Sequence, residues 1–401
     1  MRDLSQSANG DRVAARRAGQ RLERIRPFHV MEVMARAGEL ERLGRRIIHM
    51  EIGEPDFPTA PSIVEAAERA LRAGHTGYTP ASGLPALREA IAGYYGARYG
   101  VAIGPERVLI TPGASGALQL ALAWATQPSD EVLLADPGYP CNRSMVHFLG
   151  AVPRNVATDA STRYQLPAEL VAPRINPATA AILAASPSNP TGTLIDPDQL
   201  AALVALARQH GLRLIMDEIY HGLVYGPDCH SVLETDPDAI VVNSFSKYFG
   251  MTGWRVGWLI APEAAVRDME RLQQNLFIAA STPAQYGALA AFGDDAMAVH
   301  EARRQQFRQR RDFLLPALRE LGFRIPVTPD GAFYLYAECS RFGHDSETLA
   351  GIMLEEAGVA ATPGLDFGEY RAQEHVRFAY TTSLDSLEAG VERLRTMLGA
   401  S

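Results

Sequence analysis

The chain has 401 residues, 47% of them hydrophobic, which predicts a soluble globular protein of two coupled domains. A net charge of −8, with no basic stripe beyond residue 26, argues against nucleic-acid binding, and no segment approaches the roughly 20 apolar residues of a membrane-spanning helix. The widely spaced Cys141, Cys229 and Cys339 predict neither a disulfide framework nor a metal site, and they indicate a reducing cytoplasm.

The first hundred residues predict a leader and then helices. Residues 1–26 are polar and arginine-rich and lack the apolar core of a secretory signal, so we expect a disordered leader or an arm. Apolar residues at helical spacing predict three helices, at 27–43, 61–73 and 84–99. A short strand is predicted at 47–52, where it runs into the turn that begins at Gly53.

From about residue 107, short apolar runs alternate with helical stretches. The runs are 108–110, 131–134, 181–183, 212–216, 240–242 and 258–260. Most are followed by turn residues, which is typical of a mostly parallel sheet that helices cover on both faces. In such sheets, functional groups gather beyond the carboxyl ends of the strands.

The last third of the chain predicts a second, smaller domain. A long helix over residues 283–321 leads into it, and the remaining runs predict strands at 333–336 and 376–379 and helices at 346–357 and 386–398. We therefore expect a leader (1–26), an N-terminal segment that joins the small domain (27–52), a large domain (53–290) and a small C-terminal α+β domain (291–401).

Lysine is almost absent from this sequence. Of the 38 basic residues, 37 are arginine and one is Lys247. A biased base composition can replace lysine by arginine at every position where only the positive charge matters. Arginine cannot replace an amine that must attack a carbonyl, because the guanidinium group stays protonated. Lys247 is therefore a candidate nucleophile, with chance survival as the alternative.

Three local patterns fit a phosphorylated aldehyde. Residues 110–116 form a glycine-containing turn between a strand and a helix predicted at 117–125, where main-chain N–H groups can bind an anion, although many such turns are glycine-rich for steric reasons. Asp217 and Tyr220 follow another strand and could bind a ring nitrogen and a ring oxygen, although a helix cap with a packing tyrosine is the alternative. The block 244–258 places two hydroxyls and a guanidinium, which suit phosphate, around an amine, which suits an aldehyde.

From about residue 27 to the C-terminus, the chain resembles a class I aminotransferase of the aspartate aminotransferase superfamily. The resemblance rests on four motifs in the family's order: Ser-Asn-Pro-Thr-Gly at 188–192, Asp217 with Tyr220, Ser-Phe-Ser-Lys at 244–247, and Arg377. It implies PLP fold type I, an α/β fold in which a mostly parallel seven-stranded sheet with helices on both faces is joined to a smaller α+β domain.

The resemblance also implies how pyridoxal 5'-phosphate (PLP) is held. Lys247 bonds covalently to the cofactor and moves the substrate proton, and Asp217 keeps the ring nitrogen protonated. Tyr220 and Asn189 bind the ring oxygen, and Tyr139 stacks on the ring. The phosphate contacts are Ser244, Ser246, Arg255, the main chain of Ala114 and Ser115, and Tyr78 of the neighbouring subunit, so a homodimer with shared active sites is implied.

For the substrate, the resemblance implies that Arg377 binds the α-carboxylate and that Asn189 and Gly53 lie beside it. The predicted reaction is ping-pong transfer of an amino group from an L-amino acid to a 2-oxo acid. One subgroup of aspartate enzymes carries a lysine where this chain has Ser115, so we expect a neutral or aromatic donor rather than aspartate.

Three alternatives stay open at this point. A carbon–sulfur β-lyase would use the same cofactor site. A non-enzymatic regulator would need a DNA-binding module in front, for which 26 residues are too few. A relative that has lost its cofactor would have no reason to keep Lys247, Asp217 and Arg255 together.

Overall fold

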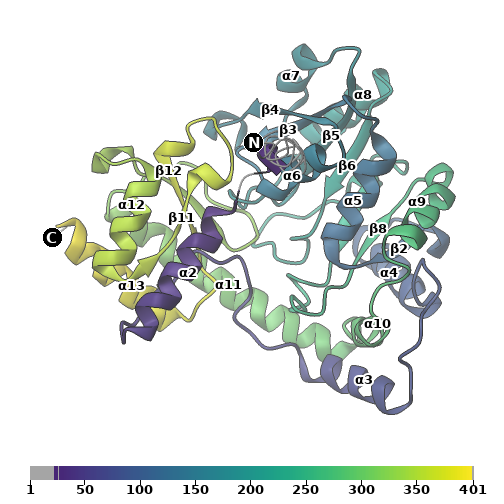
Figure 1. The fold of residues 1–401 in the computed structure, drawn as a ribbon, viewed down its shortest axis with the longest axis horizontal. Coiled ribbons are helices and arrows are strands. Elements are labelled where there is room, and N and C mark those ends of the chain that lie inside the picture. The colour runs from purple at the N-terminus through teal and green to yellow at the C-terminus, as the bar shows by residue number, and fades with distance from the viewer. Residues whose placement is uncertain (1–21, 26, 400–401) are drawn as a thin grey trace, which may run out of the picture.

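The computed structural model describes residues 22–25 and 27–399, so the predicted leader at 1–26 lies almost wholly outside the described residues. Two parts are visible in Figure 1, a larger one on the right and a smaller one on the left. The long helix α11 (Asp294–Glu320) runs from the larger part to the smaller one.

The larger part is built on a seven-stranded sheet in the order β2-β8-β7-β6-β5-β3-β4. Its strands are β2 (Val108–Thr111), β3 (Glu131–Asp136), β4 (Val152–Ala157), β5 (Thr179–Ala185), β6 (Arg213–Asp217), β7 (Ile240–Ser244) and β8 (Gly257–Ile260). Strand β8 runs opposite to the other six strands, which all point the same way, so the predicted mostly parallel sheet is confirmed. The sequence patterns missed β4 because this edge strand is only partly buried and has no apolar run.

Both faces of this sheet are buried, which explains the continuous apolar runs. Successive residues of β3 alternate between two cores, with Leu133 on one side and Val132 and Leu134 on the other. One core is completed by α5 (Gly113–Ala125), α6 (Pro140–Phe148) and α9 (Glu263–Leu276). The other core is completed by α4 (Pro85–Tyr99) and α8 (Pro197–Gln209), and a short helix α7 (Ala168–Val171) precedes α8.

The smaller part joins the two ends of the described chain. Its antiparallel sheet has the order β11-β12-β9 and consists of β9 (Tyr334–Glu338), β11 (Thr362–Pro363) and β12 (His375–Ala379). The N-terminal β1 (Ile48–His49) pairs in parallel with β10 (Val359–Ala360). The helices are α2 (His29–Arg42), α12 (Ser346–Ile352), which continues into a π-helical turn, and α13 (Leu384–Leu398). The proposed domain boundaries stay predictions.

The prediction of one helix over 283–321 is wrong. The segment forms α10 (Thr282–Ala290), which packs on α3 (Pro61–Arg72), and then α11, with a break at 291–293. Gly293 is the N-cap of α11, and Asp294 and Asp295 occupy its first turn. Negative charge at a helix N-terminus is favourable, so this Gly-Asp-Asp sequence starts a new helix.

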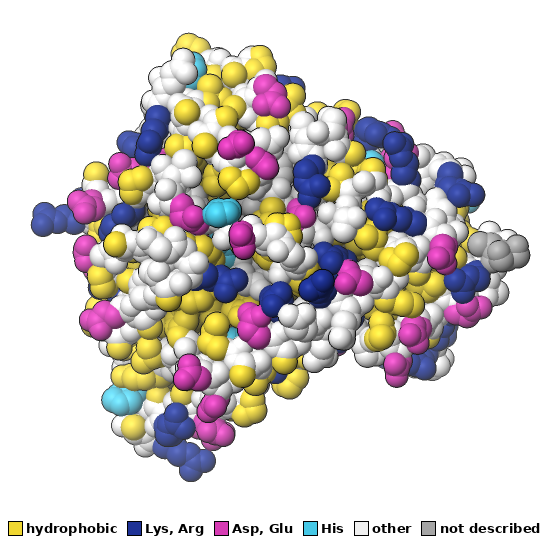
Figure 2. Space-filling view, turned by 180° about the vertical axis from the view of Figure 1, so that it is seen from behind, with side chains coloured by type: hydrophobic (Ala, Val, Ile, Leu, Met, Phe, Trp, Pro, Cys, Tyr) yellow, Lys and Arg dark blue, Asp and Glu magenta, His cyan; other side chains and the backbone are white. Residues whose placement is uncertain are grey.

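The surface carries charges of both signs. On the face shown in Figure 2, basic and acidic side chains are interspersed, with hydrophobic side chains between them. In the part of the chain that the structure describes, no helix is long and apolar enough to span a membrane.

Candidate active site

The carboxyl ends of β6 and β7 bring Asp217 and Lys247 into one site. Lys247 follows β7 by three residues, and its Nζ donates a hydrogen bond to the main-chain oxygen of Gly53 (2.7 Å). Burial lowers the pKa of the Lys247 amine to about 8, although the negative charge of Glu54 opposes the shift. A larger fraction of this amine is therefore unprotonated near neutral pH than in an ordinary lysine.

Asp217 faces the same space from the end of β6. Burial raises the pKa of its carboxyl to about 6, against a hydrogen bond from the main-chain N–H of Ile219 to Oδ1 (3.0 Å) and the charge of Lys247. Among the described residues, Asp217 forms no salt bridge. A carboxylate in this position fits a protonated ring nitrogen, which would supply the missing positive charge.

The first turn of α5 and Arg255 form one end of the site, called here the Arg255 end together with Ser244 and Ser246. The helix begins at Gly113, not at the predicted 117, because the glycine-containing turn is itself its first turn. Ala114 and Ser115 therefore present main-chain N–H groups that no side chain caps. Gly113 has a φ of +68°, and a Cβ there would lie 2.5 Å from Nη2 of Arg255.

The two serines lie against this turn. The Ser244 hydroxyl donates to Oγ of Ser246 (2.9 Å) and accepts from the main-chain N–H of Ser246 (3.0 Å). A Cβ on Gly257 would lie within 2.8 Å of the main chain of Gly113 and Ala114, so β8 contacts α5 backbone to backbone. Arg255 itself is exposed. The Arg255 end combines hydroxyls, a guanidinium and a helix N-terminus, which is the donor set for a phosphate.

Arg377 of β12 forms the other end, called here the Arg377 end together with Asn189 and Tyr334. Arg377 is 5% exposed and donates to Oδ1 of Asn189 (2.9 Å) and to the main-chain oxygen of Glu51 (2.6 Å). Its guanidinium lies 4.3 Å from the ring centroid of Tyr334. The buried Nε of Arg377 has no hydrogen-bond partner, so a donor is available for a carboxylate.

Further aromatic residues lie beside the Arg377 end. The hydroxyls of Tyr220 and Tyr334 are 2.9 Å apart. Tyr139, the N-cap of α6, accepts a hydrogen bond from the Cys141 thiol (3.2 Å), and its ring centroid is 6.5 Å from that of Phe28. The sequence reasoning missed Tyr334 and Phe28, because Tyr334 reads as a core residue of an apolar strand and Phe28 stands far away in the chain.

Tyr78 is the one predicted site residue that this chain leaves outside the site. Its side chain is 84% exposed in the loop after α3. The Thr282 hydroxyl donates to the main-chain oxygen of the preceding Gly77 (2.6 Å), which places Tyr78 beside the start of α10.

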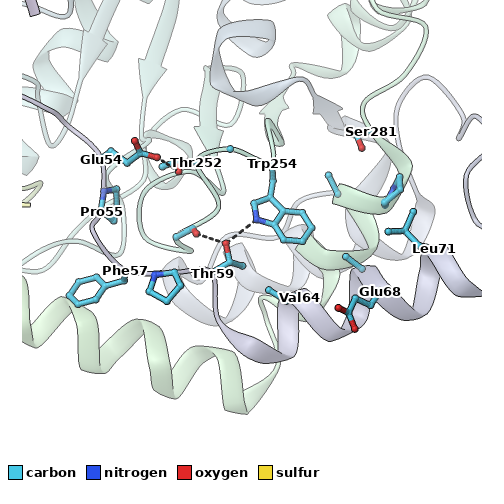
Figure 3. A pocket seen from close by; sticks show the side chains of 16 residues that line it. Glu54, Pro55, Phe57, Thr59, Val64, Glu68, Leu71, Thr252, Trp254 and Ser281 are labelled. Carbon is cyan, nitrogen blue, oxygen red and sulfur yellow. Dashed lines mark hydrogen bonds between the residues drawn. The ribbon is translucent and has the colours of Figure 1, made fainter. Parts of the chain in front are cut away.

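A hollow of about 640 Å³ lies next to this region and extends to the loop after Lys247. In Figure 3, Glu54 lies beside Thr252, and the indole of Trp254 points toward Thr59. Thr252 donates to Glu54, and Nε1 of Trp254 donates to the Thr59 hydroxyl (2.9 Å). These bonds fix the loop after Lys247 on the N-terminal segment that carries Gly53.

The fold and the site define a class of protein. The seven-stranded sheet with its smaller α+β domain is PLP fold type I, and among solved structures the chain is similar to an aspartate aminotransferase of Thermus thermophilus bound to maleate. That match has a TM-score of 0.90 and 35% identity, and it covers 99% of this chain and 100% of the other.

The family follows from the sequence comparison. Residues 45–394 match the family model described as aminotransferase class I and II, and the chain belongs to that family. A valine–pyruvate aminotransferase of Mycobacterium tuberculosis is 37% identical over 97% of this chain and 99% of its own length. A Methanococcus jannaschii structure, described as similar in its active site to kynurenine aminotransferases, has a TM-score of 0.87 and 36% identity, over 95% of this chain and 99% of that one.

The protein is thus a transaminase that uses PLP, as class I and II aminotransferases do. The residues present fit this group. Among residues 22–25 and 27–399, Asp217 forms no salt bridge, Nε of the buried Arg377 has no hydrogen-bond partner, and no side chain caps the α5 N-terminus. Each of these groups matches one polar part of a complex of cofactor and amino acid.

Proposed function

We propose that this transaminase takes a neutral or aromatic L-amino acid as donor in preference to aspartate, and that it passes the amino group to a 2-oxo acid. The proposal rests on the side chains that could bind a second carboxylate of the donor. Ser115 is uncharged, and Arg143 beside Tyr139 already donates to the main-chain oxygens of Phe367 (2.7 Å) and Asp366 (2.8 Å). Among the described residues named at the site, a distal carboxylate would therefore lack a second counter-charge.

The aromatic and acidic neighbours of the site support the same preference. The rings of Phe28 and Tyr139 offer apolar surface for a neutral side chain. The carboxylate of Glu54, next to Gly53, repels a second negative charge. The names of the relatives point in both directions, since they include a valine–pyruvate enzyme and an aspartate enzyme.

We infer a role for each residue of the site, and the geometry supports these roles. Lys247 holds the cofactor and then uses its Nζ to move the proton at the substrate Cα, a task that an amine with a lowered pKa performs near neutral pH. When bound, PLP supplies an electron sink for the negative charge that develops at Cα. Asp217 holds the ring nitrogen, Tyr220 and Asn189 hold the ring oxygen, and Tyr139 covers the ring.

Other residues hold the two anionic groups. The Arg255 end binds the phosphate, through Ser244, Ser246, Arg255 and the main chain of Ala114 and Ser115. Arg377 binds the substrate carboxylate, and Gly53 leaves room for the substrate beside it. Because Arg377 is buried and donates three hydrogen bonds, to Asn189, Glu51 and Thr362, it is oriented before the substrate arrives.

We also propose a cytoplasmic homodimer in which Tyr78 reaches the phosphate of the partner subunit. Tyr78 and Arg255 are both exposed in the single chain, and the hollow in Figure 3 is lined by Leu71 near the end of α3 and by Trp254, which precedes Arg255. A second copy on this face would cover these side chains. Sedimentation analysis should give a dimer, and Tyr78→Phe should weaken cofactor binding.

A half-reaction screen tests the donor preference. The purified protein is mixed with each common amino acid while the absorbance of the bound cofactor is followed, and valine or phenylalanine should react faster than aspartate. Ser115→Lys is the matched variant, and it should raise the rate with aspartate relative to valine. Faster reaction with aspartate in the unmodified protein contradicts the proposal, and release of pyruvate from a cysteine conjugate without an oxo acid replaces it with a β-lyase.

A further inference from the structure

Tyr334 lies where three distant parts of the chain meet. It is the first residue of β9 and is 1% exposed. Its hydroxyl meets Tyr220 from the large domain, its ring faces Arg377 from β12, and its hydroxyl also lies against Gly53 from the N-terminal segment. Each of these three neighbours has a proposed role at the active site, whereas Tyr334 has none so far.

The contact with Gly53 is the closest of the three. A Cβ built on Gly53 would lie 1.9 Å from the Tyr334 hydroxyl oxygen and 2.9 Å from its Cζ. Non-bonded carbon and oxygen atoms do not approach so closely, so no side chain fits at position 53 while the hydroxyl is present. The main-chain oxygen of Gly53 also accepts the hydrogen bond from Lys247. Tyr334 thus fixes the segment against which the amine of Lys247 rests.

The contact with Tyr220 is a hydrogen bond between two buried phenols. A phenol has one O–H to donate. If Tyr220 donates its proton to the ring oxygen of the cofactor, the 2.9 Å bond between the two hydroxyls requires Tyr334 to be the donor to Tyr220. Hydrogen bonds in such a chain polarise one another, so the second bond strengthens the first.

The contact with Arg377 uses the face of the Tyr334 ring. The guanidinium carbon lies 4.3 Å from the ring centroid, where the negative face of an aromatic ring attracts a cation. The ring is itself held edge-on to Tyr220, with centroids 5.8 Å apart and an interplanar angle of 82°. Its orientation is therefore fixed before a substrate binds, and it restricts the plane of Arg377.

We propose that Tyr334 is a positioning residue of this active site, which orients Tyr220 through its hydroxyl, Arg377 through its ring, and the Gly53 segment through close contact. The inference rests on the proposed functions of Tyr220 and Arg377. It predicts separate effects on Tyr220, on Gly53 and on Arg377. The first two depend on the hydroxyl, and the third depends on the ring, which stays when the hydroxyl is removed.

Tyr334→Phe tests the hydroxyl. In the holoenzyme, loss of the second hydrogen bond should move the pH midpoint of the cofactor absorbance upward by roughly half a pH unit, in the same direction as Tyr220→Phe but less. Tyr225→Phe is the matched control, since it also removes a buried phenolic donor, to the main-chain oxygen of Ala332, but touches none of the three neighbours. A midpoint unchanged in Tyr334→Phe, or equally changed in the control, overturns this effect.

The contact with Gly53 is tested in the cofactor-free protein, so that the result does not depend on the reaction. Gly53→Ala should lower the Tm in the parent, and by about 3 °C less in the Tyr334→Phe background, because the hydroxyl in its way is gone. Equal losses in both backgrounds contradict the proposed contact.

Tyr334→Leu tests the ring. Compared with Tyr334→Phe, which keeps the ring, it should weaken the binding of 3-methylbutanoate, a carboxylic acid without an amino group, by about tenfold. Equal affinity in the two variants contradicts the role toward Arg377. A parent protein that binds neither PLP nor this acid contradicts the proposed function instead, so the two failures are distinguishable.

Discussion

The two ends of the active site differ in how completely a single chain builds them. At the Arg377 end, the guanidinium is buried and receives partners from the N-terminal segment, from the loop after β5 and from β9. At the Arg255 end, the main chain is tightly packed, but Arg255 and Ser115 are exposed. The first end is preorganised, whereas the second leaves its positive groups open to the cofactor and to the proposed partner subunit.

This difference suits the two ends to different tasks, which are orienting the substrate and holding the phosphate. A group that must hold many different substrates in one orientation gains from a rigid setting, because its orientation is fixed in advance. A phosphate that stays bound through many turnovers can be held by groups that become ordered only with it. Substitutions at Lys247, at Arg377, at Arg255 and at Asp217 test whether the two ends differ in this way.

Lys247→Arg should have the largest effect. The variant keeps the charge but has no amine that can lose its proton, so turnover should fall roughly 10⁴-fold. Steady-state rates with saturating PLP measure the loss, and thermal unfolding of the cofactor-free protein verifies folding. Activity within tenfold of the parent would show that the only lysine of the sequence is not the group that moves the proton.

Arg377→Lys should come next. Lysine cannot offer a planar fork, so kcat/KM for the amino acid should fall about 10²-fold to 10³-fold while the affinity for PLP stays within about threefold. Kinetics at saturating PLP and a cofactor titration separate the two effects. Equal loss in both would contradict the assignment of this end to the substrate.

Arg255→Gln should show the converse pattern. The affinity for PLP should fall about 10-fold to 100-fold, because a charged hydrogen bond to phosphate is lost, whereas KM at saturating PLP should hardly change. Since Arg255 is exposed, the Tm of the cofactor-free protein should stay within about 1 °C. A large fall in Tm would mean that this end is as preorganised as the other.

Asp217→Asn should change stability only slightly, and the size of the change should depend on pH. The pKa of the Asp217 carboxyl is raised from 3.8 to about 6 in the folded chain, because burial favours the neutral form. The stability that the chain has with a neutral Asp217 is therefore fully present below pH 3.8 and is lost as the pH rises through 6. In the cofactor-free protein the variant should therefore raise the Tm by about 1–3 °C above pH 6 and not below pH 4. A Tm difference that is constant with pH contradicts the shift.

Much of the fold was predictable because its signals are local. Continuous apolar runs predicted six of the strands, since a strand buried on both faces needs apolar residues at every position. The early start of α5 was missed because Gly113 was interpreted as part of a turn. The break between α10 and α11 was missed because Gly293 was overlooked as the start of a new helix. The edge strand β4 had no apolar run to reveal it.

The chemical groups of the site can be recognised without coordinates: a single lysine among 37 arginines, with hydroxyls before it and a carboxylate at the end of a predicted strand. The neighbours of these groups cannot, because they come from distant parts of the chain. The bond from Lys247 to Gly53 joins residues 194 positions apart, and the bonds from Arg377 to Asn189 and from Tyr220 to Tyr334 span 188 and 114 positions. Local patterns reflect the burial of each segment, whereas such contacts depend on how the sheet, the N-terminal segment and the small domain pack together.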